Sequence, residues 1–172
     1  MADRLDKQTR LSPPLMHVFR AAHVAKDAKK RAVAQRRLQG RQVITESDLR
    51  HEVLHDLSML LNTVALASTV DMMDAPHVRN SILNFGIPDV TKRSIDEIGV
   101  NEIAEEIRTA IVNFEPRLAS ASLEVERDTS VDPAELKVRF VVRAELMCEP
   151  IHVPVEFVAE VMDSGKFVIN RL

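Results

Sequence analysis

The feature that most constrains this chain is a helical pattern that runs into a Glu-Pro-Arg triplet and is followed by strand-like sequence. Residues 101–114 carry apolar side chains at three- and four-residue spacings, as on one face of an amphipathic helix. Pro116 disfavours helical geometry at Glu115, so the helix should end near Phe114. After Arg117 the apolar period changes from about 3.6 residues to two. A helix and a sheet therefore meet at a corner where an acid and a base flank a rigid residue.

Four strand-like segments follow this corner. Apolar and polar residues alternate over residues 123–126, 138–147 and 153–162, and a tight turn at 163–166 leads to a closing strand at 167–171. Short turns between successive strands predict a four-stranded antiparallel meander with one apolar and one charged face. Helices must cover the apolar face, so the predicted fold class is α+β. The charged face and at least one edge strand should stay open.

The first half of the chain predicts mainly helix. Residues 47–63 have a broad apolar face, and either Thr45 or Ser47 can cap the start of that helix. A short helix is expected over residues 76–83. A loop containing a glycine with positive φ is expected at residues 84–89. These helices should pack on the apolar face of the sheet.

The N-terminal part is strongly basic. Residues 1–41 hold eleven Lys or Arg against three Asp, a charge of +8, and the remainder holds twelve against twenty-three, a charge of −11, which together recover the net −3. Residues 15–38 are rich in Ala, Lys and Arg, so we expect a partly helical basic arm at 1–44 ahead of a domain at 45–172. Such an arm suits an anionic membrane surface, a nucleic acid or an acidic protein face, or it simply stays solvated. Its one aromatic residue, Phe19, does not support base stacking, so no nucleic-acid partner is predicted.

Composition points to a soluble cytoplasmic protein. The chain has one cysteine, Cys148, which excludes an internal disulfide and a cysteine metal cluster. The sequence shows no signal-peptide pattern and no apolar run near the roughly 20 residues that span a bilayer, so we expect no direct membrane insertion. Six Phe without Trp or Tyr imply a core built mainly from aliphatic side chains.

One segment matches the zinc-protease pattern H-E-x-x-H. His51 and His55 would lie on one helical face, and Glu52 could act on a zinc-bound water. The longer form of the pattern requires Gly and His where this chain has Ser58 and Leu61. The polar face of an ordinary amphipathic helix explains the same residues. We expect no metal and no cofactor, and a zinc-dependent hydrolase stays an alternative.

Glu115 suggests a second enzymatic alternative, a peptidoglycan muramidase. Glycoside hydrolysis needs two carboxylates, and nothing in the sequence selects a partner for Glu115. An acid at a helix end next to Arg117 is more typical of an ion pair. The chain also lacks a glycine-rich phosphate loop, because its four glycines are scattered. The sequence therefore favours a non-enzymatic protein with an open sheet edge that a strand of another chain could extend.

Three segments in order resemble one family. They are Asp-Leu-Ser-Met-Leu-Leu-Asn-Thr at residues 56–63, Ser-Ile-Leu-Asn-Phe-Gly-Ile-Pro-Asp at 81–89 and Phe-Glu-Pro-Arg-Leu at 114–118. Together with the meander, they resemble the TssE family of type VI secretion baseplate subunits. That family is related to the wedge protein of contractile phage baseplates and was once labelled "lysozyme-like". The resemblance covers roughly residues 45–172.

The resemblance implies a structural role without a small-molecule substrate. The protein would bind the helical bundle of the wedge subunits TssF and TssG, and TssK is a further expected partner. It would provide the platform on which the contractile sheath of TssB and TssC begins to polymerise, at the cytoplasmic side of the inner membrane. The Glu-Pro-Arg triplet would be the centre of the wedge contact, and the Leu-Leu-Asn-Thr segment would pack nearby and orient it. The partner-binding residues implied in this way are Glu115, Pro116, Arg117, Leu60, Leu61, Asn62 and Thr63.

Overall fold

The computed structural model describes residues 11, 44–91, 97–130, 137–148, 152–162 and 164–171. The chain separates into two compact units, one of residues 1–53 with 148–151 and one of residues 54–147 with 152–172. In the first unit, Leu11 and Ile44 are buried and exchange two backbone hydrogen bonds of 3.2 Å. The rest of the predicted arm at 1–44 lies outside the described residues.

Helix α3 (Glu46–Leu61) begins at one of the two predicted caps. The Thr45 hydroxyl accepts a hydrogen bond of 3.1 Å from the Asp48 N–H. The acidic residues Glu46 and Asp48 occupy the first turn, where the helix dipole favours negative charge. The apolar face of the helix is buried at Leu49, Val53, Leu57, Leu60 and Leu61. The helix ends two residues before the predicted position.

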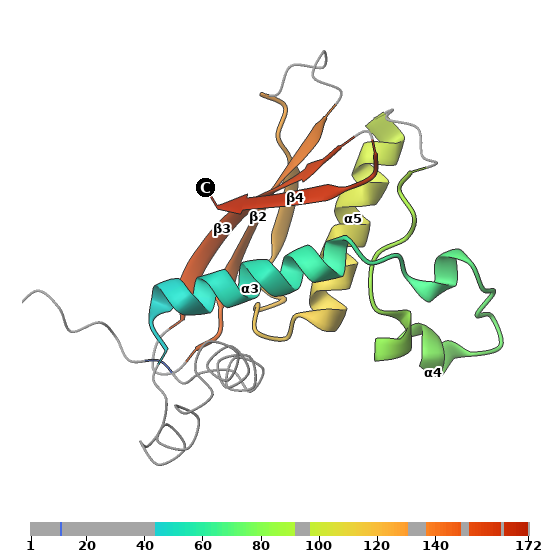
Figure 1. The fold of residues 1–172 in the computed structure, drawn as a ribbon, viewed down its shortest axis with the longest axis horizontal. Helices are drawn as coiled ribbons and strands as arrows, with labels where there is room; N and C mark the ends of the chain where they lie inside the picture. The colour runs from blue at the N-terminus through green and yellow to red at the C-terminus, as the bar shows by residue number, and fades with distance from the viewer. Residues whose placement is uncertain are drawn as a thin grey trace, which may run out of the picture. The chain divides into compact units, whose positions relative to one another are not determined.

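Helix α5 (Glu97–Phe114) ends where the sequence predicts. Its last turn is closed by the Glu115 N–H, which donates to the Ile111 carbonyl at 2.8 Å. Its buried side chains repeat at three- and four-residue spacings, at Val100, Ile103, Ile107, Ala110 and Ile111. The helix contacts strand β1 (Figure 1). The amphipathic pattern thus places one face of α5 in the core.

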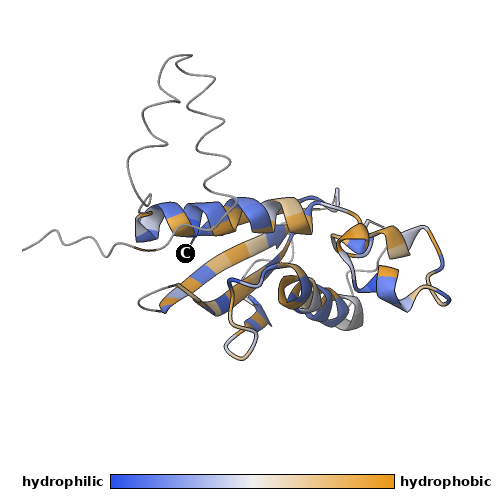
Figure 2. Cartoon of the chain, turned by 90° about the horizontal axis from the view of Figure 1, so that it is seen from below, coloured by the Kyte–Doolittle hydropathy of each residue, from blue (hydrophilic) through white to orange (hydrophobic). Residues whose placement is uncertain are grey.

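The four strands form the predicted antiparallel meander. They are β1 (Glu124–Arg127), β2 (Val138–Leu146), β3 (Val153–Val161) and β4 (Phe167–Arg171), in the order β1-β2-β3-β4. Phe140 pairs with Ala159, and Val142 with Phe157, on the buried face. Figure 2 shows hydrophobic and hydrophilic residues alternating along the strands. The fold is therefore α+β, as predicted.

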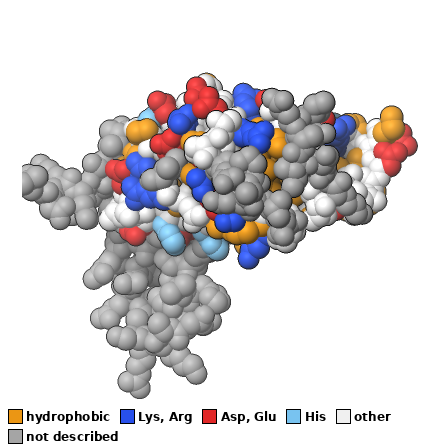
Figure 3. All heavy atoms as spheres, turned by 90° about the horizontal axis from the view of Figure 1, so that it is seen from above, with side chains coloured by type: hydrophobic (Ala, Val, Ile, Leu, Met, Phe, Trp, Pro, Cys, Tyr) orange, Lys and Arg blue, Asp and Glu red, His pale blue; other side chains and the backbone are white. Residues whose placement is uncertain are grey.

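The outward face of the sheet carries cross-strand ion pairs. Arg139 lies opposite Glu160 and bonds it at 2.6 Å, and Arg143 lies opposite Glu156 and bonds it at 2.8 Å. Arg143 also bonds Glu126 of β1 at 2.8 Å. Opposite charges at directly paired positions stabilise this strand register, because a one-residue slip would separate the ion pairs. Figure 3 likewise shows acidic and basic side chains interspersed on one face of the molecule.

Residues 64–87 form a lobe between α3 and α5. Here the predicted single helix over 76–83 is wrong: α4 (Pro76–Arg79) and the 3-10 turn η2 (Ile82–Asn84) are separate elements. Ser81 interrupts them because its backbone is extended and its hydroxyl accepts from the Leu83 N–H at 3.2 Å. Together with the 3-10 turn η1 (Leu66–Ser68), these elements contain no buried residue.

The lobe returns to the end of α3 through a close backbone contact. Ile87 donates to the Thr63 carbonyl at 2.9 Å, and Ala65 donates to the Ile87 carbonyl at 2.8 Å. Gly86 has φ +122°, and a Cβ at this position would lie 2.2 Å from the Thr63 oxygen. Only glycine fits both the backbone angle and the space, so the predicted positive φ at this loop is confirmed.

Candidate docking site at the helix–sheet corner

The Glu-Pro-Arg triplet connects α5 to the edge of the sheet. After the helix ends at Phe114, the Leu118 N–H donates to the Glu115 carbonyl at 3.2 Å. The Arg117 carbonyl accepts from the Met147 N–H at 2.7 Å, just beyond the end of β2. The backbone of the triplet is therefore held at both sides, by the helix before it and by the sheet after it.

Glu115 and Arg117 form the predicted ion pair. Arg117 Nε donates to Glu115 Oε1 at 2.6 Å, Nη2 donates to Oε2, and the Arg117 backbone N–H donates to Oε1 at 3.2 Å. Nη2 also donates to Asp56 Oδ2 of α3 at 2.6 Å. One guanidinium thus joins two carboxylates from separate helical segments, and Asp56 is a member of the cluster that the sequence did not indicate.

The electrostatics of the corner keep the guanidinium charged. Burial by itself would lower the pKa of Arg117, but its hydrogen bonds and charge interactions with Glu115 and Asp56 raise that pKa above the ordinary value. Glu115 is 4% exposed, and both of its oxygens face Arg117. A carboxylate in this setting is a bidentate anchor and is badly placed to donate a proton to a substrate.

The seven residues expected to bind partners fall into two groups. Leu60, Leu61 and Glu115 are buried, so their side chains belong to the interior of this chain. Pro116 and Asn62 are exposed, while Thr63 and Arg117 are half-buried, the Arg117 side chain at 19% exposure. The Thr63 hydroxyl donates to the Met59 carbonyl at 2.7 Å, which closes the last turn of α3.

Asn62 makes a long-range contact. Its Nδ2 donates to the Phe167 carbonyl at 3.0 Å, and its Oδ1 accepts from the Phe167 N–H at 3.0 Å. The side chain therefore bonds both main-chain groups of the first residue of β4. The motif residue thus joins the end of α3 to the sheet.

Sequence reasoning missed an apolar surface on the lobe. The short helical elements of the lobe contain no buried residue, and large apolar side chains are exposed there. The exposed fraction is 85% for Met73 and 72% for Ile82. The exposed members are Val64, Leu66, Val70, Met73, Ile82 and Leu83. The sequence indicated this surface only indirectly, through an apolar stretch at residues 64–75 that has neither a helical nor a strand period.

Hydrogen bonds hold this lobe in shape. Asn84 Oδ1 accepts from the Ala67 N–H at 2.8 Å, and Asn84 Nδ2 donates to the Arg79 carbonyl at 2.9 Å. The Phe85 ring packs edge-to-face on Phe114 with centroids 5.3 Å apart, one residue before Glu115. The lobe and the corner are therefore physically connected.

The H-E-x-x-H segment lies on α3. His51 and His55 are exposed, and Glu52 is half-buried. Within the described ranges, no group of three or more His, Cys, Asp or Glu is arranged to hold a metal ion. Leu61, where a third histidine would be required, is part of the core.

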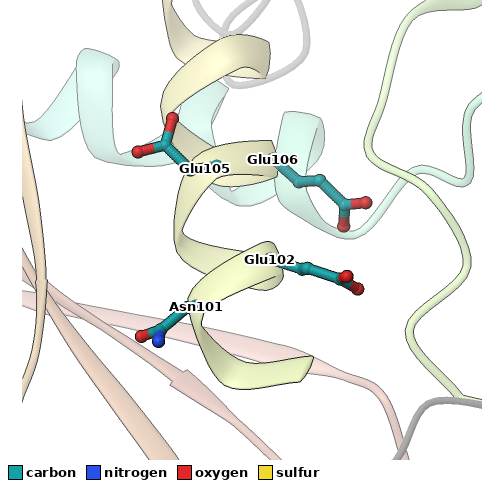
Figure 4. A pocket seen from close by; sticks show the side chains of 4 residues that line it. All are labelled: Asn101, Glu102, Glu105 and Glu106. Carbon is teal, nitrogen blue, oxygen red and sulfur yellow. The ribbon is translucent and has the colours of Figure 1, made fainter. Parts of the chain in front are cut away.

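A shallow hollow of about 510 Å³ lies along α5 at Asn101, Glu102, Glu105 and Glu106. Figure 4 shows Asn101 and Glu105 on one side of the helix and Glu102 and Glu106 on the other. Side chains that diverge in this way do not make a common binding site.

The described helices include none with the length and apolar character needed to cross a bilayer. Comparison with known families matched residues 47–151 to the family of baseplate wedge protein gp25. No curated protein and no solved structure matched the chain significantly. The matched region contains the corner, the lobe and strands β1 and β2. The chain belongs to the family of baseplate wedge protein gp25, the family that contains TssE.

Proposed function

We propose that this chain is a non-enzymatic structural subunit of the type VI secretion baseplate wedge. It docks on the bundle of TssF and TssG, with TssK as a neighbour, and supports the first sheath ring of TssB and TssC on the cytoplasmic side of the inner membrane. Membership of a baseplate wedge family supports a structural role among other baseplate proteins.

One observation carries the proposal: the charged side chains of the corner bind one another and so connect separate elements of this chain. The buried Glu115 carboxylate is bonded by Arg117, which reaches Asp56 of α3. This leaves the exposed Pro116 beside the partly exposed side chain of Arg117 as a rigid surface. A preorganised surface of this kind loses little conformational freedom when a partner binds.

The lobe supplies an apolar neighbour to this corner. Met73, Ile82 and Leu83 present large exposed apolar side chains, and such patches mark interaction surfaces. The apolar surface suits the side of a helical bundle, while the corner supplies a charged contact that sets orientation. We therefore assign both to the TssF–TssG contact.

Co-purification with TssF and TssG tests this assignment. Arg117→Glu, confirmed as folded by circular dichroism, and Ile82→Asp should each weaken recovery with the wedge subunits and reduce sheath assembly. Val112→Asp is a matched control, because Val112 is also an exposed apolar residue but lies on α5 outside the lobe. Full binding and assembly by a folded Arg117→Glu protein would contradict the corner assignment.

Peptidoglycan turnover tests the enzymatic alternative. The burial of Glu115 and its bonds to Arg117 predict no cleavage by the wild type and therefore no effect of Glu115→Gln on that assay. Cleavage that is abolished by Glu115→Gln, or stoichiometric zinc that is lost in His51→Ala, would overturn the non-enzymatic assignment.

A further inference from the structure

The amide of Asn62 binds the edge strand β4 in the way that a neighbouring strand would. It accepts from the N–H of Phe167 and donates to the C=O of Phe167, both at 3.0 Å. The same Nδ2 donates to the Ser58 carbonyl at 2.9 Å, which fixes the orientation of the amide. The side chain of Asn62 thus makes, with Phe167, the two backbone hydrogen bonds that a neighbouring strand would otherwise make.

The bonded groups of Phe167 lie on the outer edge of the sheet. In the hairpin from β3 to β4, Met162 donates to the Lys166 carbonyl at 2.9 Å, so Lys166 faces β3. Hydrogen-bonding direction alternates along a strand, so Val168 and Asn170 also face β3, while Phe167, Ile169 and Arg171 face outward. Strand β4 is at the end of the sheet order. Its outer edge therefore comprises three residues, and Asn62 covers the first.

We propose that Asn62 is an edge cap that shortens the usable edge of β4 to Ile169 and Arg171 and thereby keeps a second copy of this chain from pairing there, β4 to β4. Unpaired strand edges are sites of association, and proteins commonly protect them. In this chain the protecting group is a side-chain amide from the end of α3, and its partner lies 105 residues later.

Symmetry shows what the cap prevents. Antiparallel pairing of two β4 strands centred on Ile169 would place Phe167 of each copy opposite Arg171 of the other. Each Phe167 would then have to supply the N–H and C=O that Asn62 occupies. Pairing that avoids Phe167 can use only two outward residues of each strand, and very short edges pair poorly.

The chemistry of the cap requires an amide at this length. Aspartate could accept from the Phe167 N–H but could not donate to its carbonyl, and glutamine would place the amide one methylene too far away. Alanine removes both bonds and uncovers the third edge residue. Asn62→Asp therefore removes one of the two hydrogen bonds to Phe167, and Asn62→Ala removes both.

Hydrogen exchange on the wild-type protein tests whether the cap exists. In the folded protein the Phe167 amide should exchange at least about tenfold more slowly than the outward amides of Ile169 and Arg171. This measurement needs no variant and so does not depend on the folding of one. Equal exchange at Phe167, Ile169 and Arg171 would overturn the proposal.

Self-association tests what the cap does. By size-exclusion chromatography with light scattering, Asn62→Ala should dimerise at about tenfold or more lower concentration than the wild type, with Asn62→Asp in between. Asn170→Ala is the matched control, because Asn170 lies in the same strand, is exposed and faces β3 with its backbone. A folded Asn62→Ala protein that has a fast Phe167 amide but associates no more than the wild type would overturn the proposal. Self-association is measured on the purified protein alone, so its outcome does not depend on whether the protein binds TssF and TssG.

Discussion

Arg117 Nη2 lies 2.6 Å from Asp56 Oδ2, although the two residues are 61 positions apart in the chain. The same guanidinium holds the buried Glu115 carboxylate. The corner between helix and sheet is thus fastened to α3 by one side chain. Its rigidity depends on a cation between two anions.

Removing that cation should be costly. Arg117→Met leaves the Glu115 carboxylate, which is 4% exposed, without its counter-ion, so we expect a loss of about 3–5 kcal/mol in unfolding free energy. Urea denaturation measures this change. Arg50→Met is the control, because Arg50 forms an i,i+4 pair with the exposed Glu46 and should cost about 0.2–0.5 kcal/mol.

Asp56→Asn should have a smaller effect than Arg117→Met. The Asp56 side chain is 21% exposed, and Arg117 would keep its bonds to Glu115. We expect a loss of about 1 kcal/mol in unfolding free energy, within the usual range for a partly exposed charged bond. A loss as large as that of Arg117→Met would show that Asp56, and not Glu115, is the main partner.

Gly86→Ala should destabilise the lobe. The backbone angle of +122° strains any L side chain by about 1–3 kcal/mol, and the new Cβ would also clash with the Thr63 oxygen. Thermal unfolding measures the cost. Gly165→Ala is the comparison: its φ is also positive, but the nearest atom is a Thr91 methyl group, which can move. Gly86→Ala should therefore lower Tm by more than Gly165→Ala.

The edge-to-face contact of Phe85 and Phe114 should couple the lobe to α5. A double-mutant cycle with Phe85→Leu, Phe114→Leu and the double variant should give an interaction free energy of about 0.5–1.5 kcal/mol. Additive effects of the two substitutions would show that the lobe is not connected to the corner through these rings.

Ser130→Ala should raise the pKa of Asp128. The hydroxyl of Ser130 is the main cause of the lowered pKa of that carboxyl, followed by the Ser130 backbone N–H. A carboxyl with a lowered folded pKa stabilises the fold above its unfolded pKa, and this contribution is lost as pH falls through the folded pKa. The wild type should therefore lose its stability advantage over Ser130→Ala below about pH 4. NMR titration of Asp128 measures the shift, with Ser164→Ala as an exposed turn control.

Much of the fold follows from local pattern. The end of α5 at Phe114, the meander and the glycine loop at Gly86 were predictable, because backbone sterics and apolar period act over a few neighbouring residues. The division of residues 76–83 into two elements was not, because the Ser81 hydroxyl competes with helical hydrogen bonds.

Sequence alone determined that an acid and a base flank Pro116 where a helix meets a sheet. Only the tertiary structure decided that Asp56 joins them and that Asn62 bonds Phe167 at the edge of β4. Helix and strand periods depend on near neighbours, whereas these contacts join residues 61 and 105 positions apart. No local repeat encodes such pairs, because packing of the whole core selects which distant side chains meet.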